Sequence, residues 1–130
     1  MSAPDAGELL ELMDRNMVAV YAADTRATPG GEVVEERGLT MCRTPHGLIG
    51  TNMAIVTGPI RAAAVRDLTR AMYAPTESPF SVWTREHADA ALEAELREIG
   101  FLEVNREPAM VFVPGAAEPG APPPEIAIRA

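Results

Sequence analysis

Hydrophobic residues recur near the start of the chain at a spacing that fits an α-helix. Asp5 and Glu8 have the spacing of a capping box, in which each side chain accepts the backbone N–H of the other residue. Residues 28–31, which contain a proline and two glycines, end the helix. We expect this amphipathic helix to cover one side of the core. Its apolar face contains Leu9, Leu10, Met13, Met17 and Tyr21.

Short apolar stretches follow and predict strands. Residues 31–37 and 39–44 are joined at Arg37-Gly38, which indicates a β-hairpin. Residues 45–50 are expected to form a loop. Residues 52–57 carry four consecutive apolar side chains and therefore predict a more buried strand.

A glycine and a proline then introduce a second helix. Gly58 provides the turn, and Pro59 suits the first helical position, where its missing N–H has no partner to lose. We expect the helix to begin at Pro59. Its predicted buried stripe contains Ile60, Ala64, Leu68 and Met72, with Ala63, Val65 and Ala71 alongside.

The third strand–helix unit begins after a proline-rich loop at residues 75–79. Residues 80–84 ("FSVWT") predict a strand, and a helix follows that ends at Gly100, where a left-handed residue allows Phe101 to pack back. Residues 101–113 predict a final strand, bent at Glu107-Pro108 because proline cannot donate to a β-ladder. In the strand predicted over residues 80–84, Phe80 and Val82 share one face and Ser81 and Trp83 the other. The helix that follows this strand is expected to bury Ala88, Leu92, Leu96 and Ile99.

The order αββ(β)αβαβ predicts an α/β fold with a mixed, mainly antiparallel sheet flanked by helices. Residues 1–114 are expected to form this single domain. Residues 115–124 have the composition of a stiff Pro/Gly-rich linker, and residues 125–130 ("EIAIRA") suit the first strand of a following domain.

Charge and cysteine content exclude several classes of function. The net charge of -8 gives no general attraction for nucleic acid or an anionic membrane, although Arg61 with Arg66 or Arg70 could meet a local anion. A single cysteine, Cys42, rules out an internal disulfide and a zinc cluster. Neither a signal peptide nor a run of about 20 apolar residues is present, so the cytoplasm is the expected location.

No conventional catalytic or metal-binding motif occurs in the chain. Cys42 and His46 are close in sequence, but a strand cysteine is usually a small buried hydrophobe and nothing orients the imidazole as a base. His87 is expected to be exposed near a helix start. Trp83 and Tyr73 are interpreted as packing residues. The glutamates at 93, 95 and 98 suit a solvated helix face, with Glu93 spaced for a pair with Arg97.

Two strand–helix units and the C-terminal tail follow one another in an order that is typical of one protein superfamily. Residues 52–72 ("NMAIVTGPIRAAAVRDLTRAM") form a strand, turn and helix after a hairpin, and residues 80–113 a strand, a helix ending in Gly100-Phe101 and a returning bent strand. The tail "PPPEIAIRA" is similar to the opening strand of a further acetyltransferase domain. Over roughly residues 13–113 and the tail, the chain resembles the GNAT (GCN5-related) N-acetyltransferases, in particular the N-terminal domain of two-domain bacterial members.

The resemblance implies a coenzyme loop that this chain has in altered form. Active members have a Q/R-x-x-G-x-G/A loop, whose backbone N–H groups hold the coenzyme A pyrophosphate at a helix start. Here residues 57–61 are shorter, contain one glycine, and lose a donor at Pro59. The acetyl-CoA site is therefore expected to be degenerate, with no cofactor and no catalytic residue.

We consider three functions for the chain. The first is a non-catalytic domain that supports a following acetyltransferase domain. The alternative is a stand-alone acyl-CoA-dependent N-acetyltransferase for a small amine, in which Thr57, Gly58, Ile60 and Arg61 would contact acetyl-CoA. The third is a self-associating module without coenzyme A, a homo-oligomer that uses a sheet edge or a groove near Trp83 and residues 45–52.

Overall fold

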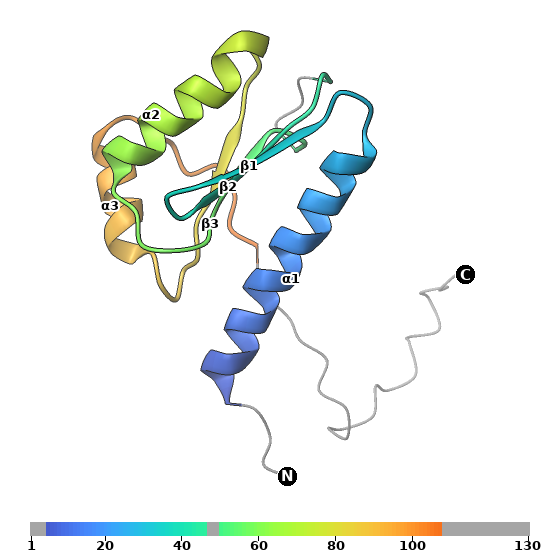
Figure 1. The fold of residues 1–130 in the computed structure, drawn as a ribbon. Coiled ribbons are helices and arrows are strands. Elements are labelled where there is room, and N and C mark those ends of the chain that lie inside the picture. The colour runs from blue at the N-terminus through green and yellow to red at the C-terminus, as the bar shows by residue number, and fades with distance from the viewer. Residues whose placement is uncertain (1–4, 47–49, 108–130) are drawn as a thin grey trace, which may run out of the picture.

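The computed structural model describes residues 5–46 and 50–107 as an α/β structure with a four-stranded mixed sheet (Figure 1). The predicted α/β class with a mixed, mainly antiparallel sheet is confirmed. The elements in chain order are α1 (Ala6–Ala27), β1 (Glu32–Glu36), β2 (Leu39–Arg43), β3 (Met53–Val56), α2 (Ala62–Tyr73), the 3-10 turn η1 (Ala74–Thr76), β4 (Ser81–Trp83) and α3 (Ala90–Glu98).

The strands lie in the order β1-β2-β3-β4. The first two pairings are antiparallel, and β4 is parallel to β3 because α2 crosses over between them. The predicted hairpin is confirmed: Arg37 and Gly38 both have positive φ, at 51° and 85°, as a two-residue turn of this kind requires.

The main core lies between one face of the sheet and the helices α2 and α3. Alternate residues of β2 and β3 point to this face, and Leu39 and Val56 are almost fully buried there. Tyr73 extends the core, with its ring stacked on Phe80 at a centroid distance of 4.7 Å. The core cluster also contains Met41, Ala54, Ala62, Val65, Met72, Leu92 and Leu96.

Helix α1 packs against β1 and β2, and its first turns extend beyond the strands (Figure 1). The predicted capping box is confirmed: the Glu8 N–H donates to Asp5 Oδ1 at 2.8 Å and the Asp5 N–H to Glu8 Oε2 at 3.2 Å. The buried Thr25 of α1 lies beside Cys42, which points to the sheet face opposite the main core. The predicted apolar face of α1 is only half-buried at all five positions.

The predicted start of α2 was wrong, and its predicted buried stripe is confirmed only in part: Met72 is buried and Leu68 packs against the core. The helix begins at Ala62 because Arg61 is still extended, with φ -93° and ψ 151°. The turn before α2 is hydrogen-bonded to the β1–β2 hairpin at Gly38, which keeps residues 59–61 out of the helix. Ile60 therefore packs against the core from outside the helix. The buried residues of α2 are Ala62, Val65, Thr69, Met72 and Tyr73, whereas Ala63 and Ala71 are exposed and Ala64 and Leu68 half-buried.

The end of α3 agrees with the prediction, but the next segment does not. Gly100 has φ 103°, and the Phe101 N–H donates to Leu96 O at 2.9 Å, which closes a Schellman motif. Leu92 and Leu96 are buried as predicted, whereas Ala88 and Ile99 are exposed.

Residues 101–107 contain no strand, which corrects the prediction of one over 101–113 for that part. Ion pairs of Arg97 and Arg106 with Glu103, and of Arg106 with Glu86, hold this segment in an irregular path. Residues 108–113, the predicted linker 115–124, the predicted strand 125–130 and part of the predicted loop (47–49) lie outside the described residues.

Candidate functional site

The turn between β3 and α2 is the place where the sequence suggested a coenzyme loop. The Thr57 and Gly58 N–H groups both donate to the Gly38 carbonyl oxygen, at 2.8 and 3.3 Å. Pro59 has no N–H to offer. The β1–β2 turn of the same chain therefore takes two of the backbone donors that precede α2, those of Thr57 and Gly58.

The side chains at the start of α2 are also engaged. The Arg61 guanidinium forms a two-pronged ion pair with Glu95 of α3, in which Nε lies 2.9 Å from Oε2 and 3.1 Å from Oε1. This pair lowers the pKa of the Glu95 carboxyl, and the backbone N–H of Ala62 lowers it further. A carboxylate of this chain thus lies where the first N–H groups of α2 favour an anion.

Four residues were predicted to contact acetyl-CoA in the enzymatic alternative. The backbone N–H groups of Thr57 and Gly58 are hydrogen-bonded to Gly38 instead, and the side chain of Arg61 is paired with Glu95. Ile60 is half-buried against the core. Sequence reasoning placed Glu95 on a solvated face. Its partner Arg61 lies 34 residues away, so no local pattern marks the pair.

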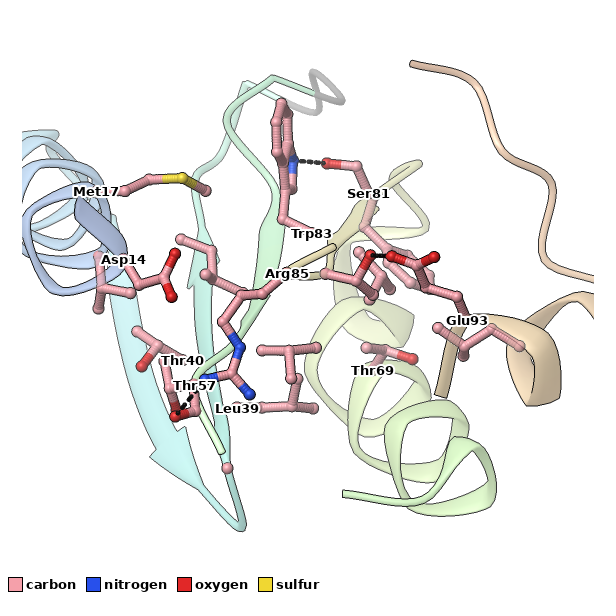
Figure 2. Close-up of a pocket in the computed structure, with 18 of the residues that line it drawn as sticks. Asp14, Met17, Leu39, Thr40, Thr57, Thr69, Ser81, Trp83, Arg85 and Glu93 are labelled. Atoms are coloured by element: carbon pink, nitrogen blue, oxygen red, sulfur yellow. Dashed lines mark hydrogen bonds between the residues drawn. The ribbon is translucent and has the colours of Figure 1, made fainter. Parts of the chain in front are cut away.

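A hollow of about 2100 Å³ opens between α1 and β4, which we call the α1–β4 hollow. Its lining includes Met13 and Met17 of α1, Trp83 of β4 and every residue from Ile99 to Glu107. Figure 2 shows Met17 and Asp14 facing Trp83 and Arg85 across it. Since Val82 and Trp83 point to opposite faces of the sheet and both line the hollow, the hollow borders both faces beside β4.

Several charged groups around the hollow are paired with other charged groups of the chain. His87 Nε2 lies 2.8 Å from Asp14 Oδ2, which joins α1 to the segment after β4. Arg85 binds the buried Asp89 through Nε and Nη2, both at 3.0 Å, and its pKa is raised by that contact. His87 is exposed just before α3, as predicted, and its ring also contacts Asp14 of α1.

The other candidate residues have structural surroundings. Cys42 is buried, and burial raises the pKa of its thiol, although hydrogen bonding from Thr25 and the charge of Arg26 oppose that shift. His46 is exposed in the loop after β2. The Tyr73 hydroxyl donates to the Cys42 carbonyl at 2.9 Å, and burial raises the Tyr73 pKa. Thiolate chemistry at Cys42 is disfavoured by this environment.

Asn52 is a buried polar residue whose role the sequence did not reveal. Its side-chain oxygen accepts the Thr44 N–H at 2.9 Å, and its backbone oxygen accepts the Ser81 N–H at 3.0 Å. The residue thus joins the end of β2 to the start of β4. In the sequence, Asn52 is only a polar residue before an apolar run, and this pattern does not indicate that its side chain is buried and hydrogen-bonded.

Within residues 5–46 and 50–107, no group of three or more His, Cys, Asp or Glu side chains is arranged to hold a metal ion. In the same part of the chain, no helix combines the length and apolar character that a membrane crossing requires. Comparison with known proteins finds no match, whether to a protein-family model, a curated protein or a solved structure.

Proposed function

We propose that this chain is a non-catalytic, acetyltransferase-like domain that does not bind acetyl-CoA and supports a catalytic domain beside it. The supporting observation is that the turn between β3 and α2 is already engaged in contacts within the chain. Thr57 and Gly58 donate to Gly38, and Glu95 lies at the start of α2 with Arg61. A pyrophosphate would have to displace all of these contacts to bind there.

The resemblance to GNAT N-terminal domains supplies the rest of the proposal. In such an arrangement the domain shapes the substrate side of its neighbour, and catalysis belongs to the neighbour. The proposal implies a cytoplasmic protein of bacterial type whose partner is an acetyltransferase domain.

Isothermal titration of the whole chain with acetyl-CoA tests the first half of the proposal. We expect no binding heat at millimolar coenzyme, a limit that corresponds to a binding free energy weaker than about -4 kcal/mol. Saturable binding that Arg61→Ala abolishes would place the coenzyme at this turn and would contradict the proposal. Arg15→Ala is the matched control, because Arg15 is exposed on α1.

The reading frame beyond Ala130 tests the second half. The proposal expects a domain with a complete Q/R-x-x-G-x-G/A loop to follow. A stop codon directly after Ala130 contradicts it, as does a following domain of another kind.

A further inference from the structure

Helix α1 carries apolar residues on the side that faces away from the sheet. Leu12 and Val20 are 56% and 49% exposed, although both have large apolar side chains. They lie four residues before and after the exposed Asn16. At about 100° per residue, Asn16 is roughly 120–180° around the helix axis from Ala22 and Thr25, the two buried residues of α1. Leu12 and Val20 therefore point outward, and the sheet does not cover them.

Packing of α1 on the sheet does not account for these outward residues. A helix that covers one side of a core needs a single apolar face, with polar side chains opposite to it. On α1, Leu9 and Ala23 stand seven residues before and after Asn16 and fall on the same outward side. We call Leu9, Leu12, Asn16, Val20 and Ala23 the outward stripe. Exposed apolar side chains that are grouped in this way mark an interaction surface, whereas scattered single ones do not.

The spacing of the outward stripe fits a second copy of the same helix. Under a two-fold axis through Asn16, an antiparallel copy places Val20 of one chain opposite Leu12 of the other. Ala23 falls opposite Leu9 in the same way, and Asn16 meets its own counterpart, with which its amide can exchange hydrogen bonds. Since Asn16 lies at the middle of α1, the two helices overlap over their full length.

The charges of α1 favour the antiparallel direction for such a pair. The first turn of the helix carries Glu8, and the last turn carries Arg26. These two residues lie about five helical turns apart and therefore on the same flank. In an antiparallel pair, Arg26 of each copy lies beside the acidic first turn of the other, and the helix dipoles are opposed. In a parallel pair, like charges would be adjacent at both ends.

We propose that the chain forms a two-fold symmetric dimer through the outward stripe, with the two α1 helices antiparallel and Asn16 at the axis. A single helix pair is at the small end of protein interfaces, so the dimer is reversible, with a Kd of roughly 10–100 µM. Below about 1 µM the chain is monomeric and Asn16 is exposed. The dimer uses neither a sheet edge nor the β3–α2 turn. It is independent of the proposed function, since it requires neither a second domain nor the absence of coenzyme.

Sedimentation equilibrium of the full chain over about 1–500 µM tests the dimer, and we expect the mean mass to rise from that of one chain toward that of two. The double variant Leu12→Asp/Val20→Asp should stay monomeric throughout, because the interface would bury unpaired carboxylates. Leu102→Asp/Val104→Asp is the matched control and should still dimerise, because it makes the same changes at residues that are 85% and 83% exposed outside α1. Unchanged far-UV circular dichroism shows that each variant is folded. A wild-type monomer at every concentration overturns the proposal, as does an equal effect of the two double variants.

Oxidative cross-linking tests the direction of the helix pair without adding a charge. In a Cys42→Ala background, Asn16→Cys brings the two new thiols together at the two-fold axis. Ala23→Cys is the matched control on the same stripe, and its two thiols would lie about 21 Å apart along an antiparallel pair. A disulfide joins Cα atoms no more than about 7 Å apart, so Asn16→Cys should form covalent dimers at least about tenfold faster than Ala23→Cys. Equal rates would indicate a parallel pair or random collision and overturn the proposal.

Discussion

Removal of the Asn52 side chain tests how the sheet is held together at the ends of β2 and β4. The residue is fully buried, and its Oδ1 accepts the backbone N–H of Thr44 at 2.9 Å. Its Nδ2 lies 3.5 Å from Pro79 O, at the limit of a hydrogen bond, so this second contact adds little. In Asn52→Ala the Thr44 N–H loses its partner in a buried site.

The expected cost follows from these contacts. A buried donor left without an acceptor costs about 1–3 kcal/mol, and the small cavity left by the amide adds to it. We therefore expect Asn52→Ala to lower the free energy of unfolding by about 2–4 kcal/mol. For a chain of this size, that corresponds to a fall of roughly 10 °C in Tm.

Urea unfolding followed by Trp83 fluorescence measures this change. The midpoint should fall by about 1–2 M at an unchanged slope, since the slope reflects the surface exposed on unfolding. Asn16→Ala, on the exposed face of α1, is the matched control and should stay within about 0.5 kcal/mol. A loss in Asn52→Ala no larger than that of the control would refute the reasoning, because Thr44 would then not depend on the amide.

Three further results are expected. Burial raises the Tyr73 pKa, so the folded chain keeps a proton that the unfolded chain releases above pH ~10. The free energy of unfolding should therefore fall as the pH rises past that point, and it should fall less steeply in Tyr73→Phe. Urea unfolding at pH 8–11 measures this difference. Gly38→Ala should lower the free energy of unfolding by about 1–2 kcal/mol, and Tm with it, because φ is 85° and the new Cβ would lie 3.1 Å from Gly58 O. Gly50→Ala is the control, because a Cβ at that position meets no atom within 4 Å. Native Cys42 should react slowly with a thiol reagent and rapidly once the chain is unfolded; equal rates would contradict its burial.

Features that depend on neighbours in the sequence were predicted well. The capping box at Asp5 and Glu8, the hairpin turn at Gly38 and the helix stop at Gly100 are local, and each matches the structure. Such features follow from backbone sterics and short-range hydrogen bonds, which a few adjacent residues specify. The alternating faces of residues 80–83 were predicted for the same reason.

The start of α2 shows where local reasoning failed. Pro59 suits a first helical position, yet the helix begins at Ala62 because the Thr57 and Gly58 N–H groups are bound to Gly38. The pairing comes from the antiparallel packing of β2 and β3, which no window around residue 59 contains. Tertiary hydrogen bonds therefore overrode the local preference for a helix start.

By itself, the sequence determined the order and type of most elements, since periodicity and turn chemistry are written in adjacent residues. Only the tertiary structure decided which groups meet: Glu95 with Arg61, His87 with Asp14, and Asn52 with Thr44. The first two of these pairs join residues 34 and 73 positions apart, and such contacts leave no periodic signal in the chain. The state of the β3–α2 turn, on which the proposed function depends, belongs to this second group.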